Sequence, residues 1–127
     1  MNKTIIFIII GIVAIGGLFW VWQYGVFSNS VTLAPIPDGI ILFYGDNCPY
    51  CKIVDDFISE NKIEDKIQFS HLEVWHNKDN QNILAQIVQK CNIQTNQVGV
   101  PFLWDSENCY IGDVDIINFF KNATDIR

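Results

Sequence analysis

The sequence predicts an α/β protein in which one N-terminal membrane-spanning helix precedes a small domain, built on a four-stranded mixed sheet with helices on both faces. Three observations predict this fold class. Residues 5–22 are apolar throughout, the run 40–44 is apolar and ends in a turn, and apolar residues with helical spacing then alternate with short strand-like segments. With 127 residues, the chain has room for one modest domain.

The N-terminal segment, residues 1–27, is predicted to be a transmembrane signal-anchor. No charged residue lies between Lys3 and Asp38, and the apolar run Ile5–Trp22 would rise about 27 Å as a helix, close to the bilayer core of about 30 Å. A cleaved signal peptide is the alternative. Its apolar core is usually shorter, about 7–15 residues, and the small residues Ser28–Ser30 lie well beyond the apolar run. An uncleaved anchor is therefore favoured.

Positive charges predict the orientation of this anchor. The α-amino group and Lys3 precede it, and the first basic residue after it is Lys52. The N-terminus is therefore expected on the inner side of the cytoplasmic membrane. The domain is expected on the outer side, where disulfides persist. Residues 28–37 are small, polar and proline-bearing, which indicates a linker, and the folded domain is predicted to cover 38–127.

The charge balance excludes one class of partner. Eight Lys and Arg stand against fourteen Asp and Glu, and the net charge is −6. A protein that coats nucleic-acid phosphates needs a cationic face, so nucleic acid is not an expected partner.

The first half of the domain is predicted as strand, helix, strand. A continuous apolar run at 40–44 is typical of a strand buried on both faces. Apolar residues at 53, 54, 57 and 58 form one stripe of a helix over 49–61, which leaves Asp55, Asp56 and Glu60 to solvent. Residues 67–75 alternate imperfectly and are predicted as the second strand.

The second half is predicted as helix, hairpin, helix. Apolar residues at 83, 84, 87 and 88 indicate a helix over 80–91, and a polar loop follows at 94–97. Strands at 101–104 and 109–111 flank a turn. The last helix is expected to begin near Asp113, which can cap it, and to turn Val114, Ile117 and Phe120 to the core.

The chemistry of the domain is predicted at Cys48-Pro49-Tyr50-Cys51, where the first strand ends and the helix begins. Unpaired N–H groups and the dipole at a helix N-terminus favour a thiolate over a thiol. A second thiol about one turn along can reach the first and release a mixed disulfide. Pro49 is tolerated in a first helical turn. The motif therefore predicts thiol–disulfide exchange, for which no cofactor is needed.

Three alternatives to exchange remain for this pair. Half of a zinc site and a copper-delivery module would both use the thiols as ligands. No second C-x-x-C or His pair stands at matched spacing, and the only Met is the initiator, so no metal ligand set is predicted. The third alternative is a redox-inert adaptor for a membrane partner. Exchange is the leading hypothesis, and soft-metal delivery is the second.

From the first strand onward the chain resembles the thioredoxin superfamily, especially its small glutaredoxin-type and bacterial thioredoxin-like members. Three features carry the resemblance: Cys48-Pro49-Tyr50-Cys51 after a buried strand, Val100-Pro101 before the hairpin, and Gly112-Asp113 before the last helix. The resemblance implies that Cys48 is the nucleophile and Cys51 the resolving thiol. It also implies substrate contacts from Pro49, Tyr50 and Val100, and a cis bond at Pro101, for which an ordinary trans proline is the alternative.

Two departures from that family affect the expected chemistry. Thioredoxins place a buried acid six residues before the first cysteine, where this chain has Leu42. The proton of Cys51 would need another route, through water or Asp46. Glutaredoxins bind glutathione partly through a Gly-Gly-x-x-Asp-like segment, which residues 111–115 match poorly, so the use of glutathione is not predicted.

Cys91 and Cys109 pose a separate question. Unpaired thiols would be a liability in an oxidising compartment, so the two are candidates for a structural disulfide. Two separate buried thiols and a second redox relay are the alternatives. His71 and His76 are interpreted as a strand and a loop residue without a ligand role. Trp75 and Trp104 are interpreted as core or rim aromatics, with a substrate-facing surface as the alternative for Trp104.

Together these features predict a membrane-anchored thiol–disulfide oxidoreductase that acts outside the cytoplasm. Its expected partners are protein disulfides or thiols near the membrane, and a membrane electron donor. Tyr50 offers no charge to Cys48, which favours a reductase or an isomerase over a strong oxidase.

Overall fold

The computed structural model describes Lys3 and residues 33–126. Apart from Lys3, the predicted anchor lies outside these residues, as does the first part of the predicted linker. Among the residues described, no helix is long and apolar enough to cross a membrane.

The last residues of the predicted linker contact the domain. The compact unit begins at Leu33 rather than near Asp38. Residues 33–37 have no regular secondary structure, yet Ala34 and Ile36 pack against the core, and the Gln86 side-chain amide donates to the Ala34 carbonyl at 3.0 Å. Apolar side chains in this otherwise small and polar segment account for the difference.

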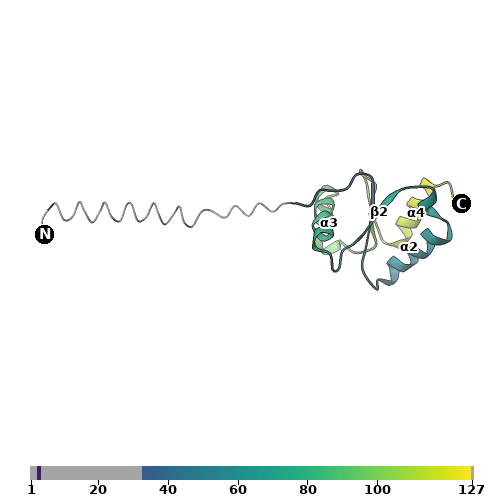
Figure 1. Ribbon diagram of the computed structural model, residues 1–127, viewed down its shortest axis with the longest axis horizontal. Coiled ribbons are helices and arrows are strands. Elements are labelled where there is room, and N and C mark those ends of the chain that lie inside the picture. The colour runs from purple at the N-terminus through teal and green to yellow at the C-terminus, as the bar shows by residue number, and fades with distance from the viewer. Residues whose placement is uncertain (1–2, 4–32, 127) are drawn as a thin grey trace. The chain divides into compact units, whose positions relative to one another are not determined.

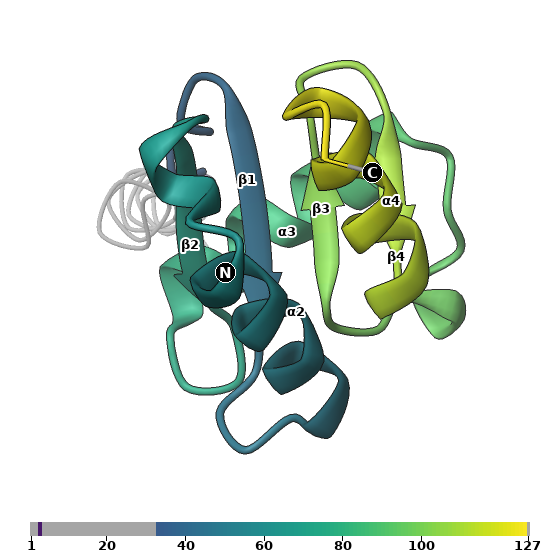
Figure 2. The ribbon, with the colours of Figure 1, turned by 90° about the vertical axis from the view of Figure 1, so that its right-hand side faces the viewer.

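The domain is built on one mixed sheet with the strand order β2-β1-β3-β4 (Figures 1 and 2). Strand β1 is parallel to β2 and antiparallel to β3, and β3 and β4 form the predicted hairpin. The predicted four-stranded mixed sheet is confirmed. In chain order the elements are β1 (Ile40–Tyr44), α2 (Pro49–Glu60), the 3-10 helix η1 (Ile63–Asp65), β2 (Phe69–Glu73), α3 (Lys78–Lys90), the 3-10 helix η2 (Thr95–Gln97), β3 (Phe102–Trp104), β4 (Cys109–Ile111) and α4 (Asp113–Ala123).

Helices cover both faces of this sheet, as predicted. Helices α2 and α4 lie on one face and α3 lies on the other (Figures 1 and 2). Alternate side chains of β1 enter the two cores: Leu42 packs toward α2 and α4, whereas Ile41 and Phe43 pack toward α3. This is the arrangement of the thioredoxin-like fold, and it places the end of β1 beside the start of α2.

Some element ends differ from the predictions. Strand β2 ends at Glu73 rather than residue 75, because the Glu73 carboxylate accepts the backbone N–H groups of residues 75–77 and turns the chain away. Helix α3 begins at Lys78, two residues early, since Asn77 caps it by accepting from the N–H groups of residues 79 and 80.

The last helix is capped differently from the prediction. Gly112, not Asp113, is the N-cap of α4, and it makes no side-chain cap hydrogen bond. Its φ of 89° lies in a region that glycine adopts readily. Asp113 is instead the first helical residue, where its charge suits the helix dipole. The buried face of α4 carries Ile116 and Phe120, and Val114 is exposed.

Candidate active site

The candidate site lies where β1 ends and α2 begins. A short turn, closed by the Cys48 N–H donating to the Gly45 carbonyl at 3.3 Å, carries the chain from the sheet into the helix. Cys48 and Cys51 are joined in a disulfide with their Cα atoms 5.2 Å apart. Cys48 is 7% exposed and Cys51 is 3% exposed, so Cys48 is the more accessible sulfur.

Helix α2 places its positive end at Cys48. Cys48 is the N-cap residue, and its Sγ accepts the backbone N–H of Cys51 at 3.1 Å. Pro49, in the first turn, has no N–H to leave unpaired. The first turn contains no acidic residue that would oppose a negative charge on sulfur. When the bond is reduced, this setting stabilises the Cys48 thiolate.

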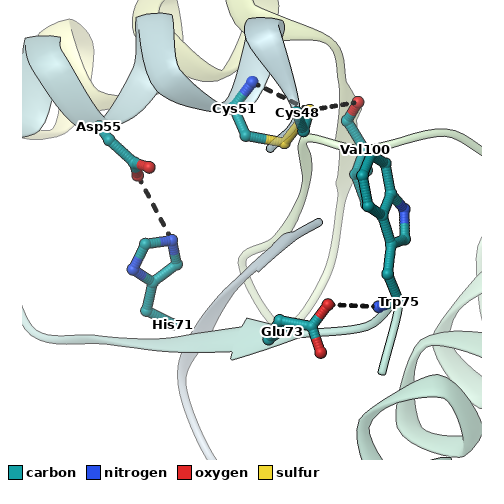
Figure 3. The surroundings of a disulfide bond; sticks show 7 residues. All are labelled: Cys48, Cys51, Asp55, His71, Glu73, Trp75 and Val100. Atoms are coloured by element: carbon teal, nitrogen blue, oxygen red, sulfur yellow. Dashed lines mark hydrogen bonds and ion pairs between the residues drawn. A yellow bond between two sulfur atoms is a disulfide. The ribbon is translucent and has the colours of Figure 1, made fainter. Parts of the chain in front are cut away.

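The loop before β3 contacts the same sulfur. The Val100–Pro101 peptide bond is cis, and the Val100 carbonyl oxygen lies 3.7 Å from Cys48 Sγ (Figure 3). Pro101 is buried, Val100 is partly buried, and Tyr50 is 60% exposed beside the pair. The structure therefore brings Val100 and Pro101 next to the cysteines, although they lie about 50 residues further along the chain.

One side of the disulfide is apolar. A groove of about 310 Å³ runs between α3 and the Val100 loop, and its lining includes Val74, Trp75, Leu84, Val88 and Val100. Trp75 is half exposed, and its indole lies so close to Gly45 that a side chain there would collide with it. The Glu73 carboxylate holds the Trp75 backbone N–H at 2.6 Å. Trp75 is therefore fixed between the groove and the turn that carries Cys48.

The other side of the disulfide is polar. An open cavity of about 520 Å³ is lined by residues that include Tyr44, Asp46, Cys48, Cys51 and Asp55. Figure 3 shows Asp55, from α2, and His71, from β2, facing each other on this side, with 3.4 Å between Asp55 Oδ1 and His71 Nε2. Burial lowers the pKa of His71, although the Asp55 and Glu64 carboxylates oppose the shift. This shift favours the neutral imidazole.

Cys91 and Cys109 form a second disulfide, with 6.3 Å between their Cα atoms. Cys91 is the C-cap of α3, and Cys109 begins β4. The bond joins the end of one helix to the last strand of the sheet. None of the contacts described above links it to Cys48 or Cys51. Within residues 33–126 no cysteine is free.

Metal ligands do not gather in the part of the chain that the structure describes. No three His, Cys, Asp or Glu residues there are close enough to hold an ion. His76, on the loop after β2, lies 3.9 Å from Asp46, and both side chains are largely exposed. His71 contacts Asp55 as described above. The geometry thus lends no support to the copper hypothesis.

One prediction about a residue near the pair needs correction. Asp55 was expected in solvent with Asp56 and Glu60, but it is partly buried and faces His71. Asp55 lies four residues after Cys51, and residues at this spacing share a helix face. This spacing could have indicated from the sequence that Asp55 lies on the cysteine side of the helix. Trp104 is buried in the core, in agreement with its interpretation as a core aromatic and not with the substrate-facing alternative, whereas the exposed Trp75 lines the groove.

Comparison with known proteins finds weak structural likenesses and no match in sequence. No protein-family model and no curated protein matches the chain. Among solved structures, the buckwheat glutaredoxin–glutathione complex is 17% identical, with a TM-score of 0.46 over 68% of this chain and 71% of that chain. Wheat glutaredoxin is 18% identical, with a TM-score of 0.45 over 73% and 85% of the two chains.

A third similar structure is oxidised glutaredoxin 2 from Chlamydomonas reinhardtii, which is 19% identical with a TM-score of 0.46 over 68% of this chain and 74% of that chain. All three likenesses are weak. The fold assignment therefore rests on the strand order and the helix positions described above, and the chemistry of the site rests on its own residues.

Proposed function

We propose that this protein is a thiol–disulfide oxidoreductase that works by exchange between Cys48–Cys51 and the disulfides or thiols of other proteins. In the reducing direction, the Cys48 thiolate attacks a substrate disulfide and Cys51 resolves the mixed disulfide. In the oxidising direction, a substrate thiolate attacks the Cys48 sulfur of the enzyme disulfide. The single observation that carries the proposal is the position of the Cys48 sulfur at the N-terminus of α2, where it accepts the Cys51 N–H at 3.1 Å. A sulfur held there is stabilised as a thiolate and is therefore both a good nucleophile and a good leaving group.

The surroundings of the pair favour a reductase or isomerase over a strong oxidase. A strong oxidase needs a reduced form that is unusually stable, which requires further stabilisation of the thiolate. Tyr50 supplies no charge, and the Val100 carbonyl oxygen at 3.7 Å opposes a negative sulfur. Both features limit the stabilisation of the Cys48 thiolate.

The groove beside the pair supports a polypeptide as the substrate. Val100 contacts Cys48 and also lines the groove, so a chain disulfide-bonded to Cys48 would reach it directly. The groove is lined mainly by Val, Leu, Ala and Trp side chains, and no Lys or Arg belongs to its lining. Glutathione carries two carboxylates and would find no cation there, whereas apolar side chains of a protein would be buried.

We propose further that residues 1–27 anchor the protein in the cytoplasmic membrane, with the domain on its outer side. The apolar run Ile5–Trp22 and the position of Lys3 before it support this placement. Resistance of the expressed protein to alkaline extraction from membranes tests the anchor. Labelling of reduced Cys48 in intact cells by a membrane-impermeant maleimide tests the orientation. If Cys48 were labelled only after lysis, the domain would lie on the inner side of the membrane instead.

The reduction potential of the Cys48–Cys51 pair tests the enzymatic proposal. Full-length protein would be equilibrated in glutathione buffers of graded ratio, and the alkylated Cys48 peptide would be quantified by mass spectrometry. We expect a potential of about −230 to −270 mV, the range of reductants, whereas about −120 mV would indicate a disulfide donor. A pair that forms no disulfide at any ratio would overturn the oxidoreductase proposal and revive metal binding.

A further inference from the structure

The resolving step of exchange raises a question about a proton. Cys51 must lose its proton before it can attack a mixed disulfide on Cys48. It is 3% exposed, so bulk water does not reach it freely. In the strand beside it, Leu42 offers no acidic group, and its side chain is buried in the core toward α2.

The cavity on the polar side of the disulfide offers a route for this proton. Cys51 and Asp55 stand four residues apart on α2, which places them on the same helix face. Both line the cavity of about 520 Å³, which has room for several water molecules at about 30 Å³ each. A carboxylate and a buried thiol thus share one water-accessible space.

We propose that Asp55 is the proton acceptor for Cys51, through water in this cavity. The inference rests on the proposed function and assigns a residue to its second step. His71 is the positioning residue: its Nε2 lies 3.4 Å from Asp55 Oδ1, and its ring is tilted against that of Tyr44, which also lines the cavity, with 4.2 Å between the ring centroids. Figure 3 shows the Asp55 carboxylate turned from α2 toward His71.

Two groups that can carry positive charge, His71 and Lys52, lie near Asp55. A cationic neighbour would weaken a carboxylate as a base. For His71, on β2, burial lowers the pKa against the opposing effects of Asp55 and of Glu64, on η1, which favours the neutral imidazole. Lys52, one turn earlier on α2, also lines the cavity, but its ammonium is paired with Asp56 at 2.8 Å.

Asp46 is the other carboxylate of the cavity lining and is the alternative acceptor. Its side chain is largely exposed and lies 3.9 Å from His76 Nε2, on the solvent side of the turn. Asp55 is only partly exposed and follows the same helix face as Cys51. The geometry therefore favours Asp55.

The proposed step balances as follows. The Cys51 proton passes through water to the Asp55 carboxylate, and the Cys51 thiolate attacks Cys48 Sγ. The bond between Cys48 and the substrate sulfur breaks, its electron pair leaves with the substrate as a thiolate, and that thiolate takes a proton from solvent. Two cysteines of the enzyme are oxidised to a disulfide, and the substrate disulfide is reduced by the same two electrons.

Stopped-flow reaction of the reduced full-length protein with 5,5′-dithiobis(2-nitrobenzoate) tests the assignment, with the Cys91–Cys109 bond left intact. Attack by Cys48 releases one thionitrobenzoate, and resolution by Cys51 releases a second. In Asp55→Asn we expect the first release to be unchanged and the second to be slowed about tenfold at pH 6–7. This loss is smaller than the loss of a general base in direct contact, because water lies between Asp55 and Cys51. The difference should vanish at high pH, where hydroxide removes the proton.

The controls separate this effect from a general change in charge. Glu60→Gln removes one charge from the exposed side of the same helix without freeing Lys52 from Asp56, and it should leave both releases unchanged. An unaltered second release in Asp55→Asn, or a slowing equal at every pH, would overturn the assignment. So would a pH-dependent slowing in Asp46→Asn instead. Failure of the wild-type protein to release the second thionitrobenzoate would refute the proposed function itself, which is a distinct outcome.

Discussion

The two disulfides of this domain lie at opposite ends of helices. Cys48 precedes the first turn of α2, where its sulfur accepts a backbone N–H. Cys91 is the C-cap of α3, at the end of the helix where the last carbonyl groups lie. A helix N-terminus stabilises a negative charge and a C-terminus opposes one. We therefore expect a disulfide to exchange more readily at the first position than at the second.

The loops that the two bonds close differ as well. Cys48 and Cys51 are 3 residues apart, whereas Cys91 and Cys109 are 18 residues apart. A disulfide stabilises a fold largely by restricting the unfolded chain, and the effect grows with loop length. Strand β4 has only three residues and is paired to β3 alone, so a bond from Cys109 to α3 holds an otherwise weakly paired edge. We therefore expect the first disulfide to serve exchange and the second to serve stability.

The largest expected effect is on activity. Replacement of Cys48 by Ser should abolish reduction of a model protein disulfide, a loss of more than about 10³-fold, because no other thiol stands at a helix N-terminus in the described part of the chain. The double variant Cys91→Ser and Cys109→Ser should keep activity within about twofold under conditions where it is folded. Turnover followed by loss of substrate disulfide measures both, and inactivity of the double variant would make the second pair a redox relay.

The next effect is on stability, where loss of the Cys91–Cys109 pair should matter more than loss of the Cys48–Cys51 pair. Removal of the Cys91–Cys109 bond by paired Ala substitutions should lower the free energy of unfolding by about 3 kcal/mol, against about 1.5 kcal/mol for the same change at Cys48 and Cys51. Denaturant unfolding of the full-length protein without reductant, followed by circular dichroism, measures the difference. Equal losses would contradict the assignment of a structural role to the second bond.

Much of this domain follows from the sequence because its signals are local. The apolar run of β1 and the helical stripes predicted the order of elements, and Cys48 at a strand–helix junction predicted the candidate site. Contacts between distant segments were harder to foresee. The pairing of Asp55 with His71 depends on how α2 crosses β2, and the exposure of Trp75 depends on its contact with Gly45. The end of β2 and the start of α3 were missed because the Glu73 and Asn77 side chains capture backbone N–H groups there.

A third effect concerns the reactivity of the reduced thiols. Cys48 should be alkylated by iodoacetamide at pH 6 about tenfold or more faster than Cys91 or Cys109, because only its thiolate is stabilised by a helix N-terminus. Timed alkylation of the fully reduced protein, with peptide mass spectrometry, measures the three rates in one sample. Similar rates for Cys48 and Cys91 would remove the electrostatic distinction between the two helix ends.

The smallest effect is a pH dependence at the loop that joins β2 to α3, the helix whose far end carries Cys91. Burial would raise the pKa of Glu73, but the N–H groups of His76, Trp75 and Asn77 outweigh it and hold the pKa below its ordinary value. A carboxyl whose folded pKa is lowered contributes stability above its unfolded pKa and loses that contribution as pH falls through the folded value.

Acidification below about pH 4 should therefore loosen the Trp75 loop in the wild-type protein, because protonation removes the acceptor that holds it. Glu73→Gln should lack this step, since its neutral amide does not titrate. Fluorescence of Trp75, isolated by subtracting the spectrum of Trp75→Phe at each pH, measures the change. Because the loop lies beside Cys48 and not beside Cys91, the exchange rate at Cys48 should change with it, while the Cys91–Cys109 bond keeps its resistance to reduction. A parallel change at both disulfides would show that α3 couples them, and the two bonds would then not be independent.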